Sequence, residues 1–332
     1  MVRPLSLAQH TLYADLLEQG DDDLFDPDLP ENGSILVRGN RTGAPAEHAY
    51  YQGYGTTVGD TARGQRYTRY LGRIDNPEVA ARIARFQRIK AVRAERTSTV
   101  RALTGAGMPK PDRTTGRIIE ALARARLFPD HAVLIAAAAF RTYDGVLGVR
   151  SAKSRNAACR TWPTVEIVVR DGHRLAEILA ALHAVDPSFA LEAASSGSYR
   201  SATSVKVAVT TLDRADEETA SLIGYLIANP VRAVVLHGPG IPVCVPAPER
   251  YAVHTLIREE AGVEGAAAMG RAHSNPGQAA ELIDALVFAH RNHALSDAFT
   301  EVRKVCPQWL RSLTTGIARL PHATRMSLSE VS

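Results

Sequence analysis

The sequence TVEIVVRDG, from Thr164 to Gly172, holds a single acid inside an otherwise apolar run. Its β-branched residues predict a buried strand over 164–169, and the Asp171-Gly172 pair predicts a turn ahead of the next helix. A carboxylate in a buried strand is costly unless it has a partner or a metal ion. Glu166 is therefore either a functional residue or an acid paired with a basic side chain such as Lys206.

The segments around this strand alternate between helix and strand along residues 112–260. Their apolar spacing predicts helices over 117–128, 137–148, 173–186 and 249–260, and strands over 131–136, 204–211 and on both sides of the Gly-Pro-Gly turn at 238–240. Such alternation is typical of an α/β fold in which helices cover a sheet. Residues 261–332 form a further region, which is helical in pattern from Gln278 onward.

The N-terminal third follows a different pattern. Residues 1–30 combine a short amphipathic helix over 5–18 with an acidic segment that contains prolines. Residues 31–104 predict a unit of three strands, over 34–40, 48–54 and 65–73, and then a long helix that starts at Pro77. The glycine- and proline-containing stretch after Leu103 marks a domain boundary.

The long helix over 78–103 is strongly basic, because residues 82–101 include seven basic residues and a single acid, Glu95. A charged face of this kind is commonly solvated, and it also suits contact with nucleic-acid phosphates. The candidate contacts are Arg82, Arg85, Arg93 and Arg96. The nearby tyrosines either form a small core or stack on bases, and they are Tyr50, Tyr51, Tyr54, Tyr67 and Tyr70.

The composition is that of a globular protein, with 45% hydrophobic and 22% charged residues among 332. The formal net charge is +4, which is compatible with nucleotide or nucleic-acid phosphates without indicating them. The three scattered cysteines match no zinc or disulfide pattern, and the longest apolar run is too short to span a bilayer. The N-terminus also lacks the pattern of a secretion signal. We therefore expect a cytoplasmic protein without a membrane segment.

Several stretches, taken in their order, resemble a bacterial nucleotidyltransferase family of the polymerase-β-like superfamily. They are VLIAAAAFRTYDGVLGVR (133–150), TVEIVV (164–169), HAVDPSF (183–189), PVCVPAPERYAVHTLI (242–257) and the N-terminal strands SILVRGN to QRYTRYLGR. The resemblance is strongest over residues 115–290. It implies a mixed sheet flanked by helices, with an N-terminal β-hairpin and helix module and a C-terminal helical region. It also implies transfer of a nucleoside monophosphate from a triphosphate to an acceptor hydroxyl, with Mg²⁺.

The resemblance also places a site. Such transfer uses two metal ions held by carboxylates, two of them at i and i+2 on one strand and a third on a neighbouring strand. Glu166 takes the first position, as catalytic and metal-binding residue, and Val168 takes the second. The third position falls near Val207 or Ala208, and Asp171 is a nearby additional acid for a metal.

The resemblance further implies where a nucleotide would bind. A turn whose backbone N–H groups reach the triphosphate falls at Ala136 and Ala137. Arg250 and His254, on the predicted helix over 249–260, are candidates for contact with phosphate or base.

Two functions of different classes follow, because one of the three expected acids is present. The first is metal-dependent nucleotidyl transfer with a degenerate and impaired site, in which RNA or protein is the acceptor. The second is binding of a nucleotide or nucleic acid without catalysis, in the same cleft or along the basic helix. Action with a partner protein, as in a toxin–antitoxin or defence pair, is a further expectation.

Overall fold

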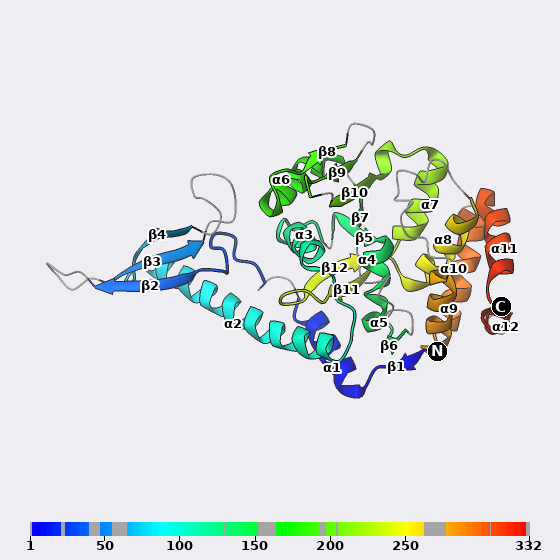
Figure 1. The fold of residues 1–332 in the computed structure, drawn as a ribbon, viewed down its shortest axis with the longest axis horizontal. Coiled ribbons are helices and arrows are strands. Elements are labelled where there is room, and N and C mark those ends of the chain that lie inside the picture. The colour runs from blue at the N-terminus through cyan, green and yellow to red at the C-terminus, as the bar shows by residue number, and fades with distance from the viewer. Residues whose placement is uncertain are drawn as a thin grey trace.

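The computed structural model describes residues 2–20, 24–39, 47–54, 65–128, 130–151, 164–170, 172–192, 197–203, 205–261, 277–305 and 307–329. Figure 1 shows three parts along the longest axis. A small sheet lies at one end, a long helix (α2, Pro77–Gly105) leads from it into a central α/β body, and helices of the C-terminal region lie at the other end.

The central body is built on a five-stranded sheet in the order β5-β7-β10-β9-β8. Its strands are β5 (Ala132–Ile135), β7 (Thr164–Val169), β8 (Ala190–Leu191), β9 (Ser198–Arg200) and β10 (Lys206–Thr211). The pair β7–β10 is parallel, whereas β5–β7, β10–β9 and β8–β9 are antiparallel. The expected mixed sheet is therefore confirmed. Its central strands are apolar on both faces, as a sheet covered on two sides requires.

Helices cover this sheet and a hairpin lies beside it. The helices are α3 (Arg113–Arg124), α4 (Ala136–Phe140), α5 (Tyr143–Val146), α6 (Leu175–Val185), α7 (Glu217–Ile227) and α8 (Pro248–Ala261), with short 3₁₀ helices at Gly172–Arg174 and Leu212–Arg214. Strands β11 (Val231–Val235) and β12 (Ile241–Val245) form the predicted hairpin, and β12 packs next to β5. Helix α3 packs on α6, while α8 contacts α7, α9, α10 and α11.

One prediction for this body was wrong, and one helix was missed. The helix expected over 137–148 is divided into α4 and α5, because the Thr142 backbone N–H donates to the carbonyl of Ala139, three residues back, which interrupts the α-helical bonding. Helix α7 was not predicted, although Asp216 caps its first turn through the Thr219 backbone N–H.

The N-terminal module forms as predicted. Strands β2 (Ser34–Gly39), β3 (Glu47–Tyr54) and β4 (Arg66–Arg73) make an antiparallel sheet, preceded by β1 (Arg3–Pro4) and α1 (Leu7–Glu18). Strand β1 pairs with β6 (Val149–Arg150), which ties the N-terminus to the central body. Asn76 accepts from the Glu78 backbone N–H and starts α2.

The C-terminal region is helical, as predicted. It contains α9 (Gln278–Phe288), α10 (Asn292–Val305), a 3₁₀ helix (Pro307–Trp309), α11 (Leu310–Arg319) and α12 (His322–Ser329). The pattern suggested one continuous helix through His290, but this residue adopts a left-handed backbone conformation that ends α9. Among the described helices, none combines the length and apolar character that crossing a membrane requires.

Candidate active site

Glu166 lies in the middle of β7, between its two neighbouring strands. It faces Ile135 of β5 and Ala208 of β10 in the sheet register, so the three side chains share one face of the sheet with Val168. Only 7% of its surface is exposed, and its Oε2 atom has no hydrogen-bond partner among the described residues. Glu166 is thus a buried carboxyl with an apolar lining of Ile, Val and Ala.

Burial sets the protonation of this carboxyl. Loss of solvent raises the pKa of Glu166 to about 7, against the weaker opposing effects of the Arg258 and Lys206 charges. The carboxyl is therefore close to half protonated at neutral pH. A group with such a pKa can exchange a proton with a reacting hydroxyl.

The alternative prediction, a direct ion pair of Glu166 with Lys206, was wrong. The Lys206 ammonium lies 3.2 Å from an Oε2 oxygen of Glu192 instead, and Glu192 also pairs with Arg200. Lys206 stands opposite Thr164 in the sheet, two positions before Ala208. Glu192, the residue after β8, is the ion-pair partner of Lys206. Lys206 therefore lowers the pKa of Glu166 only through its charge.

The predicted metal set does not come together in the described residues. The resemblance expects acids at Val168 and near Val207 or Ala208, and the strand register puts Val168 and Ala208 on the face of Glu166. Asp171 lies outside the described residues. No group of three or more Asp, Glu, His or Cys side chains suited to a metal occurs in the described parts of the chain. Mg²⁺ prefers an octahedron of oxygen ligands, and the described residues supply a single carboxyl with apolar neighbours, which does not fit a two-metal centre.

The turn at Ala136 keeps a backbone shape that glycine would favour. Ala136 follows β5 as the first residue of α4 and has φ = 54°, in the left-handed region. An L-residue other than glycine, asparagine or aspartate rarely adopts this conformation, which costs roughly 1–2 kcal/mol. The predicted phosphate turn therefore retains a glycine-like path, and contact of the Ala136 and Ala137 backbone N–H groups with phosphate stays a prediction.

An Ala136→Gly substitution is expected to stabilise the protein. Relief of the left-handed strain outweighs the added freedom of glycine in the unfolded chain, and the net gain should be about 1 kcal/mol. Chemical denaturation would measure the free energy of unfolding of each variant. Ala137→Gly is the matched control, because the neighbouring alanine has no positive φ and its replacement should stabilise nothing. A loss of stability in Ala136→Gly would contradict the explanation.

Helix α8 approaches the site through an aromatic cluster. Tyr251 of α8 packs against Phe140 of α4 and Tyr143 of α5, with ring centroids 6.2 Å and 5.4 Å away. The Tyr143 hydroxyl also donates to the Pro246 carbonyl at 3.0 Å, just before α8 begins. These contacts hold α8 against the segment that follows the Ala136 turn.

Arg250 and His254, the two candidate nucleotide contacts on α8, have different surroundings. The Arg250 guanidinium donates to the Tyr225 carbonyl at 2.9 Å and pairs with Glu301 at 2.6 Å, so it joins α8 to α7 and α10. His254 is buried, and its Nε2 atom has no hydrogen-bond partner among the described residues. Burial and the Arg258 charge hold the pKa of His254 well below its usual value, so this imidazole is neutral at pH 7. A nucleotide contact by either residue stays a prediction.

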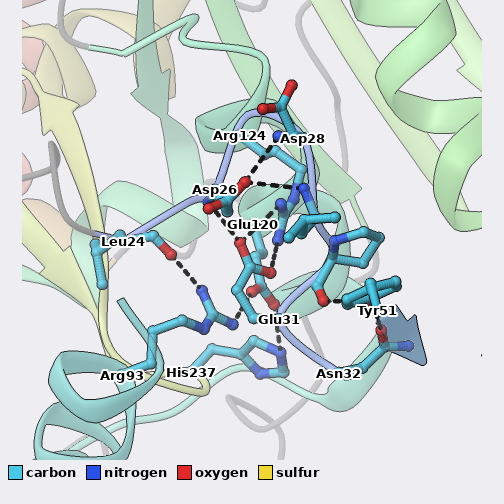
Figure 2. Close-up of polar contacts among 12 residues, drawn as sticks. Leu24, Asp26, Asp28, Glu31, Asn32, Tyr51, Arg93, Glu120, Arg124 and His237 are labelled. Atoms are coloured by element: carbon cyan, nitrogen blue, oxygen red, sulfur yellow. Dashed lines mark hydrogen bonds and ion pairs between the residues drawn. The ribbon is translucent and has the colours of Figure 1, made fainter. Parts of the chain in front are cut away.

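The basic helix is largely neutralised from within the chain. Arg82 and Arg85 of α2 form ion pairs with Asp28, and Arg85 also lies 3.4 Å from Asp26. Arg93 donates to the Leu24 carbonyl at 2.9 Å and pairs with Glu120 of α3 at 2.7 Å. Figure 2 shows how the acidic segment 24–32 lies between α2 and α3 and faces these groups.

Glu31 makes a further ion pair in this acidic network, whereas Arg96 binds backbone carbonyls elsewhere. Glu31 pairs with Arg124 of α3; burial alone would raise the pKa of Glu31, but the hydrogen bond and charge of Arg124 hold it below its usual value. Arg96 is 1% exposed and donates to the carbonyls of Leu16, Pro239 and Gly240. The four arginines that we considered for nucleic-acid contact are thus engaged inside the chain, and such a role for them stays a prediction.

Sequence patterns missed two features of this region. Arg258 influences both Glu166 and His254, and its spacing of four residues from His254 on one helix face was the available signal. The pairing of the acidic segment with α2 was also missed. Opposite charge at residues 21–31 and 82–96 is visible in the sequence, but nothing in it shows that the two segments meet.

Comparison with known proteins completes this description. A family model described as Nucleotidyltransferase matches residues 113–220 and 196–304. No curated protein and no solved structure matches the chain. The matched residues run from α3 to α10 and include the strand of Glu166, the Ala136 turn and α8. Since the two matches together span residues 113–304, more than half of the chain, the protein belongs to the nucleotidyltransferase family.

Proposed function

We propose that the protein binds a nucleoside triphosphate beside Glu166, and that nucleotidyl transfer is impaired in this chain. Membership of the family supports a nucleoside triphosphate as the ligand. The observation that carries the impairment is the face of the sheet around Glu166. The resemblance puts two metal-binding acids at Val168 and near Val207 or Ala208, and this chain has apolar residues at all three positions.

A second candidate function is transfer with Glu166 as the general base. The raised pKa of Glu166 favours it, because this carboxylate could accept the proton of an acceptor hydroxyl while the hydroxyl oxygen attacks the α-phosphate. Pyrophosphate would leave as the new phosphoester bond forms. RNA or protein as acceptor and Mg²⁺ as cofactor are further proposals that the transfer assay can test. Action with a partner protein is a separate proposal, which co-purification would test.

Binding should be measured by calorimetry, with ATP, GTP, CTP and UTP in turn, in EDTA and in Mg²⁺. We expect at least one nucleotide to bind in EDTA, since the proposal needs no metal held by the protein. The Glu166→Gln variant should bind it as tightly or more tightly, because a negative charge beside the triphosphate is removed. Absence of binding for all four nucleotides would refute the proposal.

Transfer should be measured with labelled triphosphates, total cellular RNA and protein, and Mg²⁺ or Mn²⁺. The expected result is labelling by the wild-type protein that does not exceed that of Glu166→Gln. Labelling that depends on metal and disappears in Glu166→Gln would overturn the impairment and establish the second candidate. The labelled species would then identify the acceptor.

A further inference from the structure

The N-terminal sheet has two faces of different character. Alternate residues of β3 and β4 face α2, where Tyr51 is fully buried and packs edge-on against Phe86 at 5.8 Å. Tyr67 packs on the same side, 5.9 Å from Tyr51. The Tyr51 hydroxyl donates to the Pro30 carbonyl at 2.6 Å. This inner face is the small core that the tyrosines were expected to form.

The opposite face carries the other three tyrosines. Tyr50 and Tyr70 stand opposite each other in the register of β3 and β4, with ring centroids 5.3 Å apart. Tyr54 follows two positions after Gln52 on the same side of β3. Tyr70 is 54% exposed and Tyr54 is 49% exposed, so their rings are open to solvent although aromatic side chains of this size are usually covered.

Two arginines and a histidine lie beside these rings. The Arg38 guanidinium lies 5.6 Å from the Tyr50 ring centre, and exposed Arg66 stands opposite Tyr54. His48 lies beside Tyr70, with its Nδ1 atom 2.9 Å from the Tyr70 hydroxyl. The described strand residues on this face include no acid, and they are Ser34, Leu36, Arg38, His48, Tyr50, Gln52, Tyr54, Arg66, Thr68, Tyr70 and Arg73. Asp75, just after β4, pairs with Arg73 at 2.5 Å.

A row of hydrogen-bonding side chains separates the rings. Ser34, Gln52 and Thr68 stand opposite one another across the three strands, between the Tyr50–Tyr70 pair and the Tyr54–Arg66 pair. Hydroxyl and amide groups both donate and accept hydrogen bonds. The ribose 2′-hydroxyl does the same, and it distinguishes RNA from DNA at a protein surface.

We propose that this outer face, defined by Arg38, His48, Tyr50, Tyr54, Arg66 and Tyr70, binds single-stranded RNA. Unpaired bases stack on the exposed tyrosine rings, and the two arginines contact phosphates. Stacking of this kind is open only to unpaired bases, because paired bases are already stacked within a duplex. The RNA-binding surface is distinct from Glu166, so the proposal does not depend on nucleotide binding there.

Fluorescence anisotropy should test the full chain with a labelled oligo(U) of about 15 nucleotides, long enough to cover one binding surface. Tyr50→Ala and Tyr70→Ala should each weaken binding by roughly tenfold, as loss of one stacked base predicts. Tyr50→Phe and Tyr70→Phe should restore most of the affinity, because the ring remains. Each variant must show the circular dichroism and unfolding midpoint of a folded protein.

The phosphate contacts of Arg38 and Arg66 are tested by the salt dependence of RNA binding. Each phosphate contact on a single strand contributes roughly 0.7 to the slope of log affinity against log salt concentration. Replacing both Arg38 and Arg66 by alanine should therefore lower that slope by roughly 1.4. The matched controls are Phe288→Ala and Arg311→Ala, an exposed aromatic residue and an exposed arginine in the C-terminal region, and neither should alter binding.

Three outcomes would overturn the proposal. The first is no binding of oligo(U), or equal binding by the folded double variant Tyr50→Ala/Tyr70→Ala. The second is binding of the matching deoxyribonucleotide strand as tightly as the RNA, which would remove the assignment to RNA. The third is tighter binding of an RNA duplex than of the single strand. Nucleotide binding beside Glu166, measured in the same variants, should stay unchanged in every case.

Discussion

A Glu166→Gln variant is expected to be about 3 kcal/mol more stable than the wild-type protein well above pH 7, and equally stable below pH 4.5. The difference follows from the shift in the pKa of Glu166 from 4.5 to about 7, at about 1.4 kcal/mol for each pH unit. Glutamine has nearly the same shape as glutamate and never ionises. The variant therefore removes the cost of a buried charge with little change in packing.

The direction of the effect follows from proton binding. Between pH 4.5 and about 7 the folded protein holds the Glu166 proton, whereas the unfolded chain has already lost it. The stability of the wild-type protein therefore falls across this window as the pH rises. The variant lacks this term, so the gap between the two proteins opens through the window and is constant above it.

Urea denaturation at a series of pH values would measure this gap. Glu177→Gln, at an exposed glutamate on α6, is the control for a change of charge alone and should remain within about 0.5 kcal/mol of wild type. A gap that is the same at low and high pH would show that burial does not control the protonation of Glu166. In that case the activity assays with Glu166→Gln would need another explanation.

Replacing Arg96 by alanine is expected to lower the free energy of unfolding by about 3–5 kcal/mol. Its guanidinium is almost fully buried, and it donates to the Pro239 carbonyl at 2.9 Å, to Gly240 at 3.0 Å and to Leu16 at 3.2 Å. It also reaches Gln19 at 3.3 Å. Removal of the donor leaves several carbonyl groups without a partner in a region closed to water.

Thermal and urea unfolding would measure the loss. Arg101→Ala is the matched control, because Arg101 lies on the same helix and is exposed, and its replacement should change stability by about 0.5 kcal/mol or less. Arg96→Met keeps most of the side-chain volume but no donor, so it should remain clearly destabilised. If Arg96→Met were as stable as the wild-type protein, packing rather than hydrogen bonding would be the function of this residue.

Local pattern was enough to predict most elements of the fold. Strands β7 and β10 are short and rich in valine, and the Gly-Pro-Gly turn between β11 and β12 is a direct signal in the sequence. The sequence pattern failed where local backbone contacts determine the end of a helix. Thr142 divides a helix that looks continuous, and the left-handed conformation of His290 divides another.

The site was partly predictable for the same reason. Glu166 stands out because one acid interrupts an apolar strand, and its burial was expected from that pattern. The surroundings of Glu166 could not be inferred from the sequence. Either Glu166 or Glu192 could have paired with Lys206, and the position of β8 makes Glu192 the partner. The division of the tyrosines between the two faces follows from the alternation of β3 and β4, once the register is known.

The acidic network has a consequence for the behaviour of shortened forms of the protein. Asp26, Asp28 and Glu31 act as built-in counterions for the arginines of α2 and α3. A proteolytic cut after residue 33 would remove these acids and leave Arg82, Arg85 and Arg124 without these acidic partners, whereas Arg93 would keep Glu120. Such a fragment would adhere to any polyanion, and that affinity would be an artefact of the cleavage rather than a property of the intact chain.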